Sequence, residues 1–291
     1  MHQEPRRVEF EPTPGVTLVG DEWGTAGPEV LLLGGAGQTR QAWGATGSRL
    51  GAAGFHAQAF DHRGHGESTW VGPGGYEMDA FVDDTASLAL STPEPPAIVG
   101  ASLGGLAALI GIGLRRSVRA TALVLVDIAP RIEMSGARRV LSFMAAYPDG
   151  FESLDAASRA IARYLNRDRP PTTDGLNRVL RPAGDRWLWH WDPHVLNGIG
   201  RLLDGDDATA AARAEVVSDL LHEAARNLDL PTLLVRGGLS DVVSQEGADE
   251  FLRAAPQARF VDVTDAGHMV AGDQNDIFGD VIVDFLTEVR R

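Results

Sequence analysis

The chain lacks cysteine and long hydrophobic runs, and it is poor in basic residues. None of its 291 residues is a cysteine, which excludes disulfides and thiolate metal sites. Lysine and arginine number 26 against 40 aspartates and glutamates, and the net charge of -14 argues against nucleic acid or an anionic membrane surface as a partner. No apolar run approaches the ~20 residues of a membrane span, and none follows the charged N-terminus as a secretory signal requires. We therefore expect a soluble, cytoplasmic protein.

Short apolar runs alternate with amphipathic stretches along most of the chain. Several runs are apolar on both faces, which is typical of strands in a parallel sheet that helices cover. We predict strands at 17–23, 30–33, 55–60, 97–99, 122–126, 232–235 and 259–263. We predict helices at 76–90, 103–116, 244–255 and 277–289. This alternation favours an α/β layered fold.

The interval 131–230 breaks this alternation. It is rich in alanine, arginine and aspartate at helical spacing, and it shows no convincing strand. Such an insertion is typical of a helical cap above a site, although it could also be a helical extension of the core. We therefore expect a core domain made of 1–130 and 231–291, and a helical cap (lid) of 131–230.

The stretch from Gly100 to Gly104 joins a predicted strand to a predicted helix and carries one hydroxyl. It matches the pattern G-x-S-x-G, in which a tight turn requires small neighbours and pushes the Ser102 side chain out at the carboxyl edge of the sheet. The N–H of Leu103 then lies at a helix N-terminus, where it can donate to a developing oxyanion. Ser102 is therefore a candidate nucleophile. The alternative is a serine that only caps the helix.

Two later stretches supply the groups that a serine nucleophile requires. A serine hydroxyl is a poor nucleophile at neutral pH unless a base takes its proton. Asp241 and His268 each follow a predicted strand, and the chain order Ser102, Asp241, His268 is that of one particular fold. We predict that His268 is the base and that Asp241 orients its imidazole.

These motifs resemble those of the α/β-hydrolase superfamily, in its epoxide-hydrolase-like and meta-cleavage-hydrolase-like branch. The turn Asp-x-Arg-Gly-His-Gly-x-Ser at 61–68, the elbow at Ser102, the later Asp241 and the Gly-His ending at His268 match in type, order and spacing. The resemblance covers nearly the whole chain outside 131–230. It implies a mostly parallel eight-stranded sheet flanked by helices, with an inserted helical cap.

The resemblance also assigns roles to two loops. In the loop 34–37, the N–H of Ala36 is the second oxyanion donor. The family usually has His-Gly where this chain has Gly34-Gly35. The usual histidine shapes the loop, so its absence bears on the rigidity of the loop more than on the mechanism. The turn 61–68 is structural, with Asp61 paired to Arg63 and its glycines in special dihedrals.

Three alternatives compete with these assignments. Some superfamily members carry the acid after the sixth strand, where Asp127 lies, so Asp127 is the alternative to Asp241. The H-x-x-H spacing of His62 and His65 could bind a metal, but no partner cluster accompanies it and we expect no metal. The glycines at 34–37 suggest a dinucleotide loop, but Arg40 stands where the fingerprint requires a third glycine.

Five residues are candidates for contact with the substrate. An extended segment would bring two alternating tryptophans to one side as an apolar lid, although aromatic packing of cap against core explains them equally. The others flank the predicted catalytic residues in sequence. The candidates are Gly35, Trp43, Trp187, Trp191 and Met269.

The expected reaction is hydrolysis of a carboxylic ester or lactone of a small, fairly apolar substrate, through an acyl-enzyme on Ser102. One alternative is C–C hydrolysis of a dicarbonyl, for which Arg138 and Arg139 could bind an anionic substrate. Another is a hydrolase-like protein that binds a ligand with weak turnover. No cofactor is implied, the expected partner is a small molecule, and monomer and homodimer both stay open.

Overall fold

One eight-stranded sheet joins the two ends of the chain. The computed structural model describes residues 4–165, 173, 175–200, 206–264 and 275–290. Strands β1 and β2 are antiparallel to their neighbours and the other strands are parallel, which confirms the mostly parallel sheet that the resemblance implied. In spatial order the strands are β1 (Arg6–Thr13), β2 (Val16–Trp23), β4 (His56–Phe60), β3 (Glu29–Leu33), β5 (Ala97–Ala101), β6 (Ala122–Val126), β9 (Thr232–Gly237) and β10 (Arg259–Val263).

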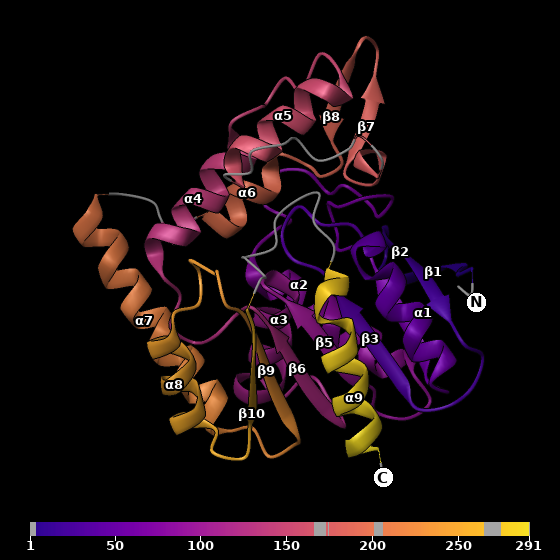
Figure 1. The fold of residues 1–291 in the computed structure, drawn as a ribbon, viewed down its shortest axis with the longest axis vertical. Helices are drawn as coiled ribbons and strands as arrows, with labels where there is room; N and C mark the ends of the chain where they lie inside the picture. Colours follow the sequence, from indigo (N-terminus) through magenta and orange to yellow (C-terminus); the bar gives the residue numbers. More distant parts are fainter. Residues whose placement is uncertain (1–3, 166–172, 174, 201–205, 265–274, 291) are drawn as a thin grey trace.

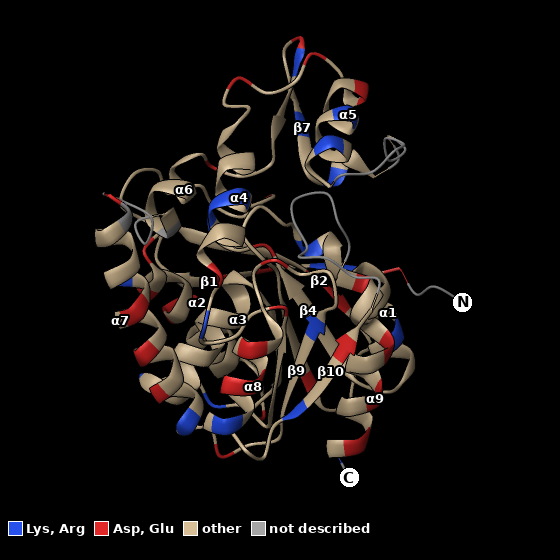
Figure 2. Cartoon of the chain, turned by 60° about the vertical axis from the view of Figure 1, so that its left-hand side comes forward, with Lys and Arg blue, Asp and Glu red and all other residues tan. Residues whose placement is uncertain are grey.

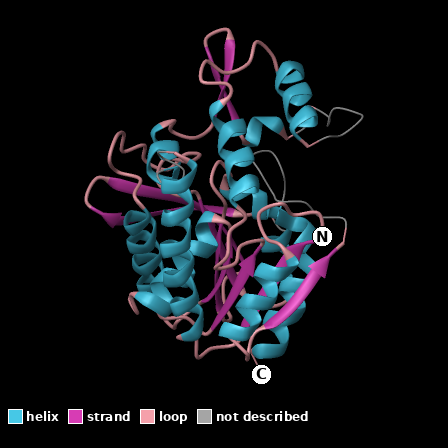
Figure 3. Cartoon of the chain, turned by 90° about the vertical axis from the view of Figure 1, so that its left-hand side faces the viewer, coloured by secondary structure: helices cyan, strands magenta, loops and turns pink. Residues whose placement is uncertain are grey.

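Helices cover both faces of this sheet (Figures 1 and 3). Strands β5 and β6 are buried along their whole length because each is apolar on both faces. One hydrophobic cluster joins the sheet to α1 (Gly44–Ala52) and α9 (Gly279–Val289). The cluster on the other face joins it to four helices, namely α2 (Met78–Ser91), α3 (Leu103–Leu109), α7 (Asp207–Arg226) and α8 (Gln245–Ala254).

The sequence patterns missed two elements of the core. Strand β1 escaped because its residues alternate between exposed and half-buried, with no buried run to mark it. Helix α1 escaped because glycine at three of its nine positions disfavours a helix. One of these glycines is required, since a Cβ on Gly47 would lie 2.3 Å from the ring of Trp23. The glycines that hid the helix are therefore partly what lets it pack.

The expectation that segment 131–230 contains no strand is wrong, because the segment contains a β-hairpin. Its helices are α4 (Met134–Ala145), α5 (Leu154–Tyr164), α6 (His194–Ile199) and α7, and between them lies a hairpin of β7 (Leu180–Ala183) and β8 (Arg186–Trp189). The hairpin turns at Gly184, whose φ of 62° suits glycine. Figure 1 shows α4, α5 and the hairpin beyond the main sheet, whereas α7 runs down beside α8. The division into core and cap stays a prediction.

The remaining short helices connect these elements. The described residues include 3-10 helices at Arg40–Trp43, Leu176–Arg178 and Asn275–Phe278, and a π-helical turn, η2 (Ile110–Leu114), that continues α3. Among the helices in the described residues, none combines the length and the apolar character that crossing a membrane requires.

Candidate active site

Ser102 lies at the sharp turn between β5 and α3. Its backbone has φ 44° and ψ -111°, a region that a non-glycine residue adopts only when its surroundings enforce it, at a cost of about 1–3 kcal/mol. The turn needs its glycines, because a Cβ on Gly100 would lie 2.5 Å from the Gly105 nitrogen and one on Gly104 would lie 2.6 Å from Leu33. The strained serine at a strand-to-helix turn is the geometry that G-x-S-x-G predicts.

The predicted oxyanion loop lies directly beside this turn. Strands β3 and β5 are parallel neighbours with Leu33 opposite Gly100, and the N–H of Gly104 donates to the Gly34 carbonyl over 3.1 Å. A Cβ on Gly35 would lie 3.3 Å from the Cβ of Ser102. The N–H of Leu103 belongs to the first turn of α3, where the helix supplies no acceptor for it.

Ala36, Ser102 and Leu103 line one cavity of about 1180 Å³. This cavity extends from the turn at Ser102 to α4, η2 and α7. Among the described residues that line it, the polar side chains are those of Ser102, Thr209 and Arg213, and the others are apolar. A reacting group at Ser102 would therefore leave water for a surface made mainly of aliphatic side chains.

Two buried histidines hold the oxyanion loop. The Nε2–H of His62 donates to the Gly34 carbonyl over 2.9 Å, and the N–H of Gly37 donates to Nε2 of His65 over 2.9 Å. His65 is therefore neutral, with its proton on Nδ1 directed at the Arg63 carbonyl 3.1 Å away. Burial lowers the pKa of His65 to about 3, and it also lowers that of His62. The two histidines thus hydrogen-bond the backbone of the loop 34–37, in which the family's usual histidine is missing.

Gln38 adds a third support to this loop. Its Oε1 accepts the Gly35 N–H at 2.7 Å, and its amide exchanges two hydrogen bonds with the amide of Asn275, of 3.1 and 3.0 Å. Both side chains are buried. Sequence reasoning missed Gln38 and Asn275, because 237 positions separate them and no local motif includes either.

The expected pair of Asp61 with Arg63 is wrong. Asp61 instead accepts hydrogen bonds from the backbone and the guanidinium of Arg40, each of 2.6 Å. Arg63 turns to α2, where both oxygens of Asp84 accept from it at 2.7 and 2.6 Å. The expected special dihedrals are present, with φ 73° at Gly64 and 51° at Gly66.

The two candidate acids occupy neighbouring strand ends. The carboxylate of Asp127, after β6, accepts from the Gly237 N–H at 3.0 Å and from the Ser240 hydroxyl at 2.8 Å. Asp241, in the loop after β9, accepts from Nε of Arg139 at 2.5 Å. Asp127 thus holds the loop that carries Asp241. His268 and Met269 lie outside the described residues.

The tryptophan candidates do not line the cavity at Ser102. Trp43 is fully buried in the core between the sheet, α1 and α9, so it has no surface for a substrate. Trp187 lies in β8, where its backbone pairs with Phe151. Trp191 stacks on Trp189 at 4.5 Å, because the strand ends at Trp189 and the alternation ends with it. Trp191 also packs against the oxyanion loop, where a Cβ on Gly37 would lie 3.2 Å from its ring.

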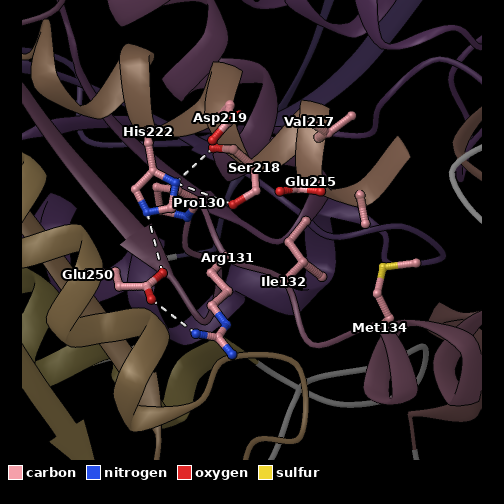
Figure 4. Close-up of a pocket in the computed structure, with 11 residues that line it drawn as sticks. Pro130, Arg131, Ile132, Met134, Glu215, Val217, Ser218, Asp219, His222 and Glu250 are labelled. Carbon is pink, nitrogen blue, oxygen red and sulfur yellow. Dashed lines mark hydrogen bonds and ion pairs between the residues drawn. The ribbon is translucent and has the colours of Figure 1, made fainter. Parts of the chain in front are cut away.

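A second, polar pocket lies between α7 and α8 (Figure 4). It has a volume of about 480 Å³ and contains Ser218, His222 and Glu250 in an order that imitates a triad. Nδ1 of His222 is 2.8 Å from the Ser218 carbonyl and therefore carries the proton, so it cannot accept one from the Ser218 hydroxyl. Glu250 is bound by Arg131 at 3.0 Å. Ser218 also lies inside a helix, where the N–H groups bond within the helix and leave none for an oxyanion.

No metal cluster replaces this chemistry in the part of the chain that the structure describes. No group of three or more histidine, cysteine or carboxylate side chains converges there. Nε2 of His62 and both ring nitrogens of His65 are hydrogen-bonded to backbone groups, as described above.

Comparison with known proteins points to one family. The model described as "Alpha/beta hydrolase family" matches residues 30–281. Esterase Rv0045c of Mycobacterium tuberculosis is 29% identical over 262 residues, which cover 87% of this chain and 80% of its own. The 2-(acetamidomethylene)succinate hydrolase of Mesorhizobium japonicum is 30% identical over 225 residues, which cover 74% of this chain and 73% of its own. The solved structure of an E-2-(acetamidomethylene)succinate hydrolase superposes with a TM-score of 0.78 at 24% identity, covering 97% of this chain and 99% of that one.

Proposed function

Because the chain belongs to the alpha/beta hydrolase family, we propose that it is a serine hydrolase that cleaves a carboxylic ester or lactone of an uncharged, apolar substrate. Ser102 is the nucleophile, His268 the base and Asp241 the acid that orients it. The N–H groups of Ala36 and Leu103 form the oxyanion hole. The observation that carries this proposal is the strained Ser102, which opens with Ala36 and Leu103 into one apolar cavity.

The reaction follows from the chemistry of these groups. The hydroxyl of Ser102 attacks the acyl carbon while His268 takes its proton, and the two N–H groups stabilise the oxyanion that forms. The C–O bond of the ester breaks, and the alcohol leaves with the proton from His268. Water, deprotonated by His268, then attacks the acyl-enzyme, and the acid leaves as Ser102 regains its proton.

The anchored loop supports this mechanism. An oxyanion hole is effective when its donors need no reorganisation as charge develops. The backbone of 34–37 is held by His62, His65 and Gln38, so the Ala36 N–H between these bonds has little freedom to move. The missing family histidine therefore need not weaken the oxyanion hole.

Hydrolysis of a C–C bond in a dicarbonyl is the second candidate. The name of the Mesorhizobium relative gives a succinate, which is an anionic substrate, so anionic substrates are a further possibility for this chain. An anionic substrate requires cations near Ser102. Arg139 is bound to Asp241, and Arg213 is the one charged side chain that the described residues place in the lining of the cavity. The aliphatic lining favours the ester.

The test is hydrolysis of p-nitrophenyl butyrate by the wild type and by Ser102→Ala. The matched control is Ser218→Ala, which removes the serine of the triad-like cluster on α7. We expect Ser102→Ala to lose roughly a thousandfold or more in kcat/KM and Ser218→Ala to equal the wild type. Activity that survives in Ser102→Ala would overturn the proposal.

A further inference from the structure

We propose that the cavity at Ser102 is a groove for the acyl chain of a medium- to long-chain ester, bound along α3 and η2 and against α7. This inference rests on the proposed function, because the chain is attached to the carbonyl that Ser102 attacks. The occupant is a neutral, unbranched acyl chain of roughly twelve carbons.

The inner wall of the groove is a stripe that starts at Ser102. Leu106, Ile110 and Leu114 follow it at intervals of four residues, all three half-buried and all three in the lining. Residues four apart lie on one face of a helix. The stripe of twelve residues is ~17 Å long, which at the ~1.5 Å C–C bond length suits an extended chain of roughly a dozen carbons.

The outer wall is the apolar face of α7. Val217 and Leu221 lie toward the core, while Val216 and Leu220 are 60% and 43% exposed. Figure 2 shows acidic positions along α7, α8 and α9, so large exposed aliphatic side chains on α7 contrast with their surroundings. Exposed aliphatic side chains next to a cavity need a cover, and an acyl chain in the groove would pack against them.

The roof of the groove comes from α4. Its side chains Ala137, Val140 and Leu141 belong to the lining, and the loop after β6 adds Ile128 and Ile132. An apolar chain gains up to about fourfold in binding for each methylene that leaves water, so a long groove distinguishes chain lengths.

A tight contact between η2 and α7 lies next to Leu114, the last residue of the stripe. A Cβ on Gly113 would lie 2.1 Å from the Ala224 carbonyl, so glycine lets α7 touch η2 there. Asn227 fastens this contact by donating from Nδ2 to the Gly113 carbonyl over 2.9 Å. The stripe on α3 and η2 therefore runs from Ser102 to Leu114, beside this contact.

The chemistry of the lining excludes other small ligands. A sugar, a peptide or a multiply charged acid requires several polar partners. Apart from Ser102, the polar side chains that the described residues contribute to the lining are those of Thr209 and Arg213, to which the proposed mechanism adds His268. The volume of about 1180 Å³ also exceeds what a short ester fills.

The experiment compares kcat/KM for p-nitrophenyl esters from acetate to hexadecanoate in the wild type and in Ile110→Trp. Ile110 lies eight residues from Ser102, or ~12 Å along the helix, so a tryptophan there shortens the groove to roughly eight carbons. We expect a wild-type optimum near twelve carbons. Ile110→Trp should lower the ratio of kcat/KM on the dodecanoate to kcat/KM on the butyrate at least tenfold, and an unchanged ratio would overturn the groove.

Two further variants guard this test. Leu220→Trp narrows the groove from the exposed side of α7 and should also reduce the preference for long chains. It replaces Ile110→Trp in the test if that variant does not fold. Leu90→Trp is the matched control, because Leu90 is 70% exposed on α2 and does not line the groove. It should leave the chain-length profile unchanged.

A binding measurement separates this inference from the proposed function. Calorimetry on Ser102→Ala with methyl decanoate and methyl butyrate reads the groove without turnover, and we expect decanoate to bind at least tenfold more tightly. If the wild type does not hydrolyse the butyrate but Ser102→Ala prefers methyl decanoate, the proposed esterase function is contradicted and the acyl-chain groove is supported. A wild-type rate that falls from butyrate onward, or a change of oligomeric state in Leu220→Trp without a change in chain preference, would overturn the groove.

Discussion

His65 lies beside the proposed oxyanion loop but does not line the cavity at Ser102. Its Nε2 accepts the Gly37 N–H, one residue beyond the proposed donor Ala36. The ring is fully buried, and its Nδ1–H is held by the Arg63 carbonyl. A side chain placed in this way acts on the reaction only through the position of the oxyanion loop.

Replacing His65 should therefore lower kcat and leave KM nearly unchanged. In His65→Leu the Gly37 N–H loses its acceptor, and we expect kcat on p-nitrophenyl butyrate to fall about tenfold to a hundredfold, short of the loss of a whole oxyanion donor. His65→Gln offers an amide oxygen and should recover most of the rate. Equal losses in both variants would contradict this role.

The low pKa of His65 and His62 also predicts an acid-sensitive fold. Burial lowers the pKa of both histidines, that of His65 to about 3, whereas in the unfolded chain both side chains titrate near 6.5. Below pH 6.5 the unfolded chain binds more protons, so stability is complete above that pH and declines as the pH falls toward 3. Urea unfolding between pH 4 and 7 should give a shallower pH slope for His65→Gln than for the wild type. An identical slope would show that His65 is not protonated on unfolding in this range.

Substitution by asparagine distinguishes the roles of the two candidate acids, Asp241 and Asp127. Asp241→Asn should lower kcat by roughly three to four orders of magnitude, because the acid of a triad fixes the histidine tautomer. Asp127→Asn should cost about 1–3 kcal/mol of stability, because an amide keeps one of the two carboxylate oxygens that accept from Gly237 and Ser240, and should lower kcat less than tenfold. The reverse pattern would make Asp127 the acid.

At the scale of elements, glycines decide how closely α1 approaches the sheet. A Cβ on Gly47 would lie 2.3 Å from the Trp23 ring, whereas one on Gly44 would meet nothing within 4 Å. Both residues belong to the same helix, so they form a matched pair.

Gly47→Ala should destabilise the fold by about 1–3 kcal/mol, because the added methyl forces the ring or the helix to move. Gly44→Ala should be neutral or stabilising by up to about 1 kcal/mol, since alanine is the better helix former. Urea unfolding measures both, and activity at 25 °C should be unchanged in both. Equal stabilities of the two variants would show that α1 can shift away from Trp23 without loss.

The elements with strong local signals could be predicted from the sequence, and those with weak signals could not. The buried strands β5 and β6 are apolar throughout, and the elbow at Ser102 combines a strand, a required set of glycines and a helix between Ala97 and Leu109. The hairpin β7–β8 was hidden by arginines and half-buried positions. The supports of the oxyanion loop could not be predicted, since His65 lies 28 positions from Gly37 and Asn275 lies 237 from Gln38.

At the scale of the whole molecule, segment 131–230 contacts the turn 61–68, which supports the proposed oxyanion loop. The backbone of 190–192 bonds to the turn 61–68, through Gly66 N–H to the His190 carbonyl and Asp192 N–H to the Gly64 carbonyl, each 2.7 Å. The same turn holds the loop 34–37 from the other side through His62 and His65. Strand ends, turn and insertion thus form one continuous frame around Ser102.

The central claim is that this frame makes Ser102 a nucleophile, and covalent labelling tests it most directly. A fluorophosphonate reacts with a serine that is deprotonated on attack, so the folded chain should take up one equivalent, mapped by mass spectrometry to Ser102. The urea-unfolded chain should take up none, because the base, the acid and the oxyanion donors come from separate parts of the sequence. An unlabelled folded chain, or a label on Ser218 or any other serine, would contradict the account.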